Sequence, residues 1–138
     1  MKTRLFASFM LIAAFLTGPT CARSGVPIVN YENVTIVTGS GKPLTLEQVK
    51  EHIIIAGAVH NWQISASEDG KLTARLLVRN KHAITVDLPY TTTQYSMIYK
   101  DSMNMNYEVS HGVPEIHPSY NKWVDTLGKD IRTELLKL

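Results

Sequence analysis

The spacing of apolar residues along this chain changes at Asn61 from a helical period to a period of two. In the segment before it, which begins at Thr45, apolar residues recur three and four positions apart, as on one face of a helix. Thr45 and Gln48 have the capping-box spacing, in which each side chain accepts a hydrogen bond from a free backbone N–H at the helix start. The pattern therefore predicts a helix that begins after Thr45 and buries one apolar stripe.

Three successive runs after Asn61 alternate apolar and polar residues. Such alternation is typical of an antiparallel sheet with one buried face and one face toward solvent. A fourth run carries Tyr95, Met97 and Tyr99 on one face, and the alternation then fades. The four runs are predicted to be consecutive strands, of which the first three cover residues 62–66, 72–78 and 84–88.

The loop between the first two strands predicts how they pair. Residues 68–70 read Glu-Asp-Gly, which offers a glycine for the left-handed position of a three-residue hairpin loop. Ser67 is therefore expected to face Lys71.

For the apolar residues of both strands to face the same side of the sheet, the second hairpin is expected to pair Arg79 with Ala83, across residues 80–82. This register places Arg75 opposite Asp87 on the exposed face of the sheet. A cross-strand ion pair of this kind contributes a few tenths of a kcal/mol, roughly, so it supports a register without indicating a function.

The last segment has the most sustained helical period in the chain. Pro118 suits the first position of a helix, because the N–H that proline lacks would have no partner there. Gly128 lies within the stripe and predicts a close approach between this helix and the sheet. The apolar stripe consists of Tyr120, Trp123, Val124, Leu127, Ile131, Leu135 and Leu138.

Together these elements predict a single α+β domain over residues 45–138. It has two layers, an antiparallel β-meander of three to four strands with an N-terminal and a C-terminal helix packed on one face. Residues 23–44 contain several prolines and glycines and are predicted to be an irregular lead-in with an edge strand at Val34–Val37.

Residues 1–22 have the pattern of a secretory signal peptide. Lys2 and Arg4 precede a mostly apolar run, Leu5–Leu16, that is shorter than the about 20 residues that span a bilayer. Small residues before position 23 predict cleavage after Ala22, and a buried N-terminal helix is the alternative. No later segment is apolar enough to predict a membrane helix, so the sequence predicts a protein exported to the periplasm.

Cys21 raises the alternative of a lipid anchor, since bacterial lipoproteins are cleaved just before a lipid-modified cysteine. The preceding residues, Gly18-Pro19-Thr20, differ at every position from the usual lipoprotein motif. If cleavage follows Ala22, the remaining chain has no cysteine, so it has no disulfide and no thiol that could serve as a nucleophile or metal ligand.

The charge balance gives no reason to expect a nucleic-acid partner. The chain has 14 basic and 12 acidic residues, and residues 1–22 hold two of the basic residues and no acidic one. The remaining chain is therefore neutral overall, which provides no electrostatic drive toward nucleic acid or an anionic membrane surface.

Four stretches of the sequence share a pattern with known proteins: HNWQI, LTARLLVRNKHAITVDLPY, YSMIYKDSMNMNY and IHPSYNKWVDTLGKDI. They resemble a group of small exported proteins of Gram-negative bacteria, several of them lipoproteins and most without a known activity. The resemblance covers roughly Ile53–Leu127. It implies an envelope location and an α+β fold, and it implies no activity.

Aromatic and amide side chains gather in the segment 95–107 and at the start of the last helix. If exposed, such side chains would bind a peptide or a glycan by stacking and hydrogen bonding. The alternative interpretation places Tyr99, Tyr120 and Trp123 in the core. The predicted binding residues are Tyr95, Tyr99, Asn104, Asn106, Tyr107, His117 and Asn121.

The sequence contains no established catalytic or phosphate-binding motif, which favours a non-enzymatic binding domain without a cofactor. Its expected partner is another envelope protein or a cell-wall fragment. One alternative is a small periplasmic hydrolase that uses His117 and Asp101. The other is a metal-handling protein in which His111, Glu115 and His117 converge. Against both alternatives, His117 is placed to cap the last helix.

Overall fold

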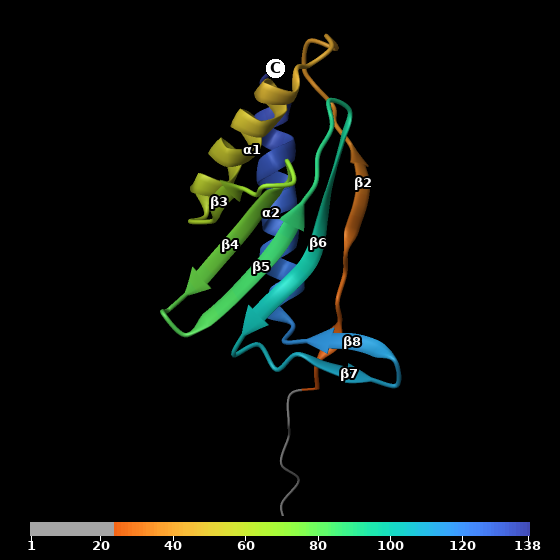
Figure 1. Cartoon of the computed structure of the whole chain (residues 1–138), viewed down its shortest axis with the longest axis vertical. Helices are drawn as coiled ribbons and strands as arrows, with labels where there is room; N and C mark the ends of the chain where they lie inside the picture. The colour runs from red at the N-terminus through yellow and green to blue at the C-terminus, as the bar shows by residue number, and fades with distance from the viewer. Residues whose placement is uncertain (1–23) are drawn as a thin grey trace, which may run out of the picture.

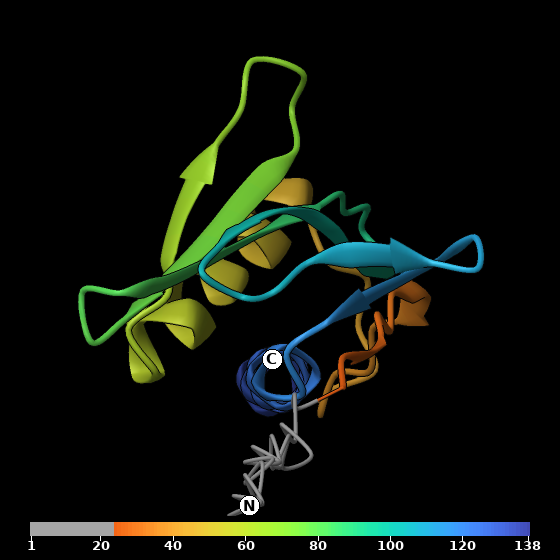
Figure 2. The same ribbon diagram turned by 90° about the horizontal axis from the view of Figure 1, so that it is seen from below.

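The computed structural model describes residues 24–138, so the predicted signal peptide (1–22) and Cys21 lie outside the described residues. It contains a five-stranded and a three-stranded antiparallel sheet together with two helices (Figure 1, Figure 2). In chain order the elements are β1 (Val26–Pro27), β2 (Tyr31–Thr35), α1 (Leu46–Val59), β3 (Gln63–Ala66), β4 (Leu72–Val78), β5 (His82–Leu88), β6 (Gln94–Met103), β7 (Glu108–Ser110), β8 (Val113–Ile116) and α2 (Ser119–Leu135).

The larger sheet has the strand order β2-β6-β5-β4-β3, and every neighbouring pair is antiparallel. Strands β3 to β6 follow chain order, while β2 joins the sheet at its outer edge beside β6. The two helices lie side by side on one face of this sheet (Figure 1), and Figure 2 shows α2 end-on below it. The smaller sheet, β1-β8-β7, lies at the end of the molecule where α2 begins.

The predicted fold class, a meander of three to four strands carrying an N-terminal and a C-terminal helix, is wrong. The structure has two antiparallel sheets, because β1 and β2 precede α1 and residues 108–116 supply β7 and β8. Three of these strands are only two to four residues long, which is too short for an alternating pattern to be recognised. In addition, β1 and β8 contain Pro27 and Pro114, and proline usually argues against a strand.

The edge strand predicted at Val34–Val37 corresponds to β2, which begins earlier, at Tyr31. Its pairing with β6 shifts register between Tyr31 and Val34, and Asn33 between them has a left-handed φ of 52°. This irregularity breaks the alternation of side chains, so the first half of β2 does not read as a strand in the sequence.

The register of the first predicted hairpin is confirmed. The backbone N–H of Ser67 donates to the carbonyl oxygen of Lys71 at 2.8 Å, and Gly70 has the expected left-handed φ of 74°.

The register of the second hairpin is wrong. Val78 pairs with His82, so Arg75 faces Thr85 instead of the predicted aspartate. The turn causes this difference. Residues 79 and 80 both have positive φ, 54° and 52°, so the turn lies one residue earlier in the chain than predicted.

Helix α1 begins with the predicted capping box. The backbone N–H of Gln48 donates to Thr45 Oγ1 (3.1 Å), and the N–H of Thr45 donates to Gln48 Oε1 (2.9 Å). The chain described, residues 24–138, contains no helix with the length and apolarity needed to span a membrane.

Side chains from both helices and the larger sheet form one hydrophobic core. The predicted close approach at Gly128 is confirmed, since a Cβ atom added there would lie 2.9 Å from the Cε atom of Met97 in β6. The largest fully buried side chains include Ile53 of α1, Leu72, Ile84 and Leu88 of the sheet, and Tyr120, Leu127, Ile131 and Leu135 of α2.

Candidate functional site

Two adjoining hollows lie around Trp123, and we call them together the Trp123 groove. Both are lined by Trp123 of α2 and by Val78 and Arg79, where β4 ends and turns into β5. The first, of about 460 Å³, is also lined by His82, Met105, His117 and Ser119. The second, of about 450 Å³, is also lined by His60, Asn61, Trp62, Leu76, Leu77 and Thr126.

Arg79 is held at the rim of both hollows by an uncommon backbone conformation. Its φ is 54°, and of the seven non-glycine residues with positive φ in residues 24–138, five are asparagines, which tolerate this region best. A residue held in a sparsely populated region costs roughly 1–3 kcal/mol, and such residues cluster at functional sites. The β4–β5 hairpin turn requires this conformation, and it leaves Arg79 in the walls of both hollows.

Two consecutive residues, Asn104 and Met105, hold the ring of His82 and the backbone of His117. Nδ1 of His82 lies 2.7 Å from the carbonyl oxygen of Asn104, and the backbone N–H of His117 donates to the carbonyl oxygen of Met105 at 2.8 Å. Nδ1 of His117 accepts a hydrogen bond from the backbone N–H of Ser119 at 3.1 Å. His117 thus binds the first backbone N–H of α2, as the sequence predicts for a cap, although the N-cap position of the helix is Pro118, which makes no side-chain capping bond.

These hydrogen bonds give the two neutral rings opposite roles at Nε2. A carbonyl oxygen only accepts, so Nδ1 of His82 carries the hydrogen and its Nε2 is an acceptor. Nδ1 of His117 accepts, so its Nε2 carries the hydrogen and is a donor. Both rings line the first hollow, and each is held by a hydrogen bond at Nδ1, so one offers an acceptor and the other a donor at Nε2.

The aromatic residues of the segment 95–107 form a stack that continues into the core. The rings of Tyr99 and Tyr107 are parallel with centroids 5.0 Å apart, and Tyr120 meets Tyr99 edge-on at 5.6 Å. Tyr120 is fully buried, Tyr99 is half-buried and Tyr107 is exposed. Burial raises the pKa of the Tyr99 hydroxyl above its usual value, and this hydroxyl lies 2.9 Å from Ser102 Oγ.

Several of the predicted binding residues hold the fold together. Tyr95 is buried, and the amide of Asn104 donates to the carbonyl oxygen of Lys81 at 2.7 Å. Asn121 bridges the lead-in to α2, because its Oδ1 accepts from Val29 N–H and its Nδ2 donates to the carbonyl oxygen of Pro27, each at 3.0 Å. Of the predicted binding residues, only His117 lines the groove.

Sequence reasoning missed Trp123, Arg79 and His82 as site residues. Trp123 lies on the apolar stripe of α2, which assigns it to the core, although it is half-buried at the edge of that stripe. His82 was assigned to a hairpin loop, but it is the first residue of β5. The Arg-Asn pair at positions 79–80 was the available signal, since asparagine favours a left-handed turn there.

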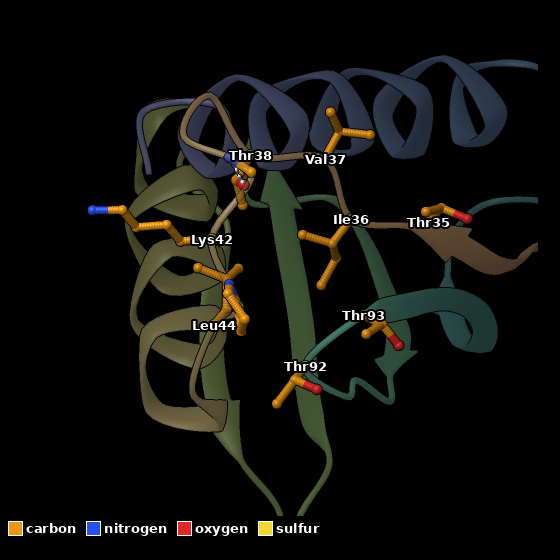
Figure 3. A pocket seen from close by; sticks show the side chains of 10 residues that line it. Thr35, Ile36, Val37, Thr38, Lys42, Leu44, Thr92 and Thr93 are labelled. Atoms are coloured by element: carbon orange, nitrogen blue, oxygen red, sulfur yellow. Dashed lines mark hydrogen bonds between the residues drawn. The ribbon is translucent and has the colours of Figure 1, made fainter.

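A third hollow, of about 510 Å³, lies between the end of β2, the loop before α1 and the β5–β6 turn (Figure 3). Thr35, Thr92 and Thr93 contribute hydroxyls, while Thr38 Oγ1 already accepts from the N–H of Gly41 at 3.1 Å. Figure 3 shows the Lys42 side chain pointing away from this hollow. Its walls thus offer less chemistry to a ligand than the Trp123 groove does.

Residues 24–138 contain no group of three or more His, Cys, Asp and Glu side chains placed to hold a metal ion. The convergence of His111, Glu115 and His117 that a metal site would need is therefore not formed. Nδ1 of His111 lies instead 3.2 Å from Ser110 Oγ.

Comparisons with known proteins returned no matching family model, no similar curated protein and no similar solved structure. The function of the groove therefore follows from the chemistry of its own residues.

Proposed function

We propose that this chain is an exported, non-enzymatic binding domain of the Gram-negative envelope, and that its ligand, another envelope component, binds in the Trp123 groove. The single observation that carries the binding role is the pair of fixed rings, His82 and His117, with opposite hydrogen-bonding roles at Nε2. Export is supported by the basic and then apolar pattern of residues 1–22 and by the resemblance to exported proteins.

The groove is suited to binding because its polar groups are ordered before a ligand arrives. Fixing a flexible side chain on binding costs roughly 0.5–1.5 kcal/mol, and rings that are already hydrogen-bonded avoid much of this cost. Trp123 adds a large, rigid aromatic face between the two hollows.

The state of His117 favours binding over the hydrolase alternative. A histidine that serves as general base donates its Nδ1–H to an orienting group, which leaves Nε2 able to accept a proton. Nδ1 of His117 instead accepts from Ser119, so Nε2 of the neutral ring carries a hydrogen and is no proton acceptor. The carboxylate of Asp101 is occupied by the backbone N–H of Ser102 at 2.8 Å.

Photo-cross-linking in intact cells tests the binding role. A benzophenone amino acid at position 126, in the wall of the groove, is expected to yield one reproducible adduct, and the same group at position 133 is expected to yield none. Thr133 is a matched control, because both threonines lie on α2 and each hydroxyl donates to the carbonyl oxygen four residues earlier. Equal adducts at both positions, or none at 126, would contradict a ligand in the groove.

Export makes a separate prediction about processing. The protein isolated from the periplasm is expected to begin at Arg23, which N-terminal sequencing and intact mass would show. A chain that begins at Cys21 with the added mass of lipid would replace the periplasmic location with a membrane anchor. An uncleaved chain confined to the cytoplasm would rule out export.

A further inference from the structure

We infer that the ligand of the Trp123 groove is an acidic oligosaccharide, one whose sugar rings carry carboxylate groups. This inference rests on the proposed function and adds to it the chemical class of the ligand. The charge, the hydrogen-bonding pattern and the shape of the groove each contribute to it.

The charge of the groove favours an anion. Its walls contain one permanent cation, Arg79, and no aspartate or glutamate. The nearby carboxylate of Asp130 is outside the groove walls, and its Oδ2 lies 2.6 Å from Nδ1 of His60. The N-terminal end of α2, which reaches the groove at Ser119, has no acidic residue in its first turn to offset its positive end.

The hydrogen-bonding pattern favours a sugar. A sugar hydroxyl both donates and accepts, so the hydroxyls of a sugar suit a hollow that is lined by an acceptor, Nε2 of His82, and a donor, Nε2–H of His117. The apolar C–H face of a sugar ring matches the flat face of the Trp123 indole, while the polar edge of the ring faces the two histidines.

The size of the groove favours a small ligand. Peptides commonly bind by adding a strand to an open sheet edge, and β4 has no partner on its β3 side beyond Arg75, so a peptide is the alternative that the experiment below must test. Hollows of about 460 and 450 Å³ lie within the range of small-ligand pockets, roughly 300–1,000 Å³. The groove therefore has the size to hold a sugar fragment.

Titration calorimetry on the purified chain tests the inference with three probes of similar length. These are the trisaccharide of galacturonic acid, the neutral trisaccharide of galactose, and triglutamate. We expect the acidic trisaccharide to bind at least about ten-fold more tightly than the neutral one, with triglutamate weaker still. The affinity for the acidic trisaccharide is expected to fall as salt is raised.

Two arginine variants locate the binding. Arg79→Asn keeps a residue that tolerates the left-handed turn and removes the cation, so it is expected to weaken binding of the acidic trisaccharide about ten-fold. Arg75→Gln removes the same charge from a residue outside the groove walls and is expected to leave the affinity unchanged. Equal losses in the two variants would mean that net charge, and not the groove, attracts the sugar.

The outcomes separate the ligand class from the binding role. Equal affinity for the neutral trisaccharide would overturn the acidic class, and tighter binding of triglutamate would overturn the saccharide. If no sugar binds but position 126 still cross-links specifically in cells, the inference fails and the proposed function stands. If neither result is obtained, both fail.

Discussion

Ile131→Ala is expected to lower the free energy of unfolding by about 2–5 kcal/mol, the usual cost of emptying a fully buried isoleucine site. Ile131 lies on the buried face of α2, has no exposed surface and belongs to the core that joins both helices to the larger sheet. Removing the branched end of its side chain loses the transfer free energy of those carbons and leaves a cavity. Urea denaturation followed by circular dichroism would measure the loss, with an unchanged slope of free energy on denaturant.

Thr133→Ala is the matched control, two residues further along the same helix. Thr133 is exposed and its hydroxyl donates only to the carbonyl oxygen of Lys129, so its replacement should change stability by no more than about 0.5 kcal/mol. A loss below about 1 kcal/mol for Ile131→Ala would mean that α2 is not packed against the sheet as described.

Elements with a long and regular period were predictable from the sequence, and the structure shows why. Helix α1 spans 14 residues and α2 spans 17, so each repeats its buried stripe over several turns. Strand β4 alternates along its length, and β5 alternates from Ile84 to Leu88. Burial of one face imposes such a pattern on the sequence, because a shift by one residue would expose every apolar side chain of a strand.

The smaller sheet and β2 were not predictable in this way, because long-range pairing forms them. Strand β1 is two residues long and pairs with β8, so the partner that makes Val26 and Pro27 a strand lies almost at the other end of the chain. The same holds for Asn121, whose two hydrogen bonds to the lead-in join residues more than 90 positions apart. The residues next to such a strand in the sequence do not show which distant residues it pairs with.

The candidate site was predictable only in part, for a similar reason. The hydrogen-bonding role of His82 depends on a carbonyl group at Asn104, which the fold brings to the ring, whereas that of His117 depends on the N–H of Ser119, only two residues away in the sequence. Asn104 also binds Lys81 through its side chain, so it fixes the β4–β5 turn against the end of β6. Loss of binding in an Asn104 variant would therefore report on the turn as much as on a ligand contact.

Tyr120→Phe is expected to raise the free energy of unfolding by about 1–3 kcal/mol, the usual cost of a buried polar group without a partner. Tyr120 has no exposed surface, and no hydrogen-bond partner for its hydroxyl lies within residues 24–138. Phenylalanine keeps the ring that meets Tyr99 edge-on and removes only the hydroxyl. Tyr107→Phe is the control, because Tyr107 is exposed and its ring would still stack, so its stability should change by no more than about 0.5 kcal/mol.

Alkaline pH gives Tyr120→Phe a second readout. Burial, and then the neighbouring Tyr99 and Tyr31, raise the pKa of the Tyr120 hydroxyl far above its usual value. Above the unfolded pKa of about 10, the unfolded chain loses a proton that the folded chain retains, so stability falls as pH rises. The variant lacks this group, so its free energy of unfolding should fall less steeply above pH 10. Some decrease remains, because the pKa values of Tyr31, Tyr95 and Tyr99 are also raised in the folded chain. An unchanged slope would mean that the hydroxyl of Tyr120 ionises as readily in the folded chain as in the unfolded one, and a loss of stability at neutral pH would mean that it has a hydrogen-bond partner in the folded protein.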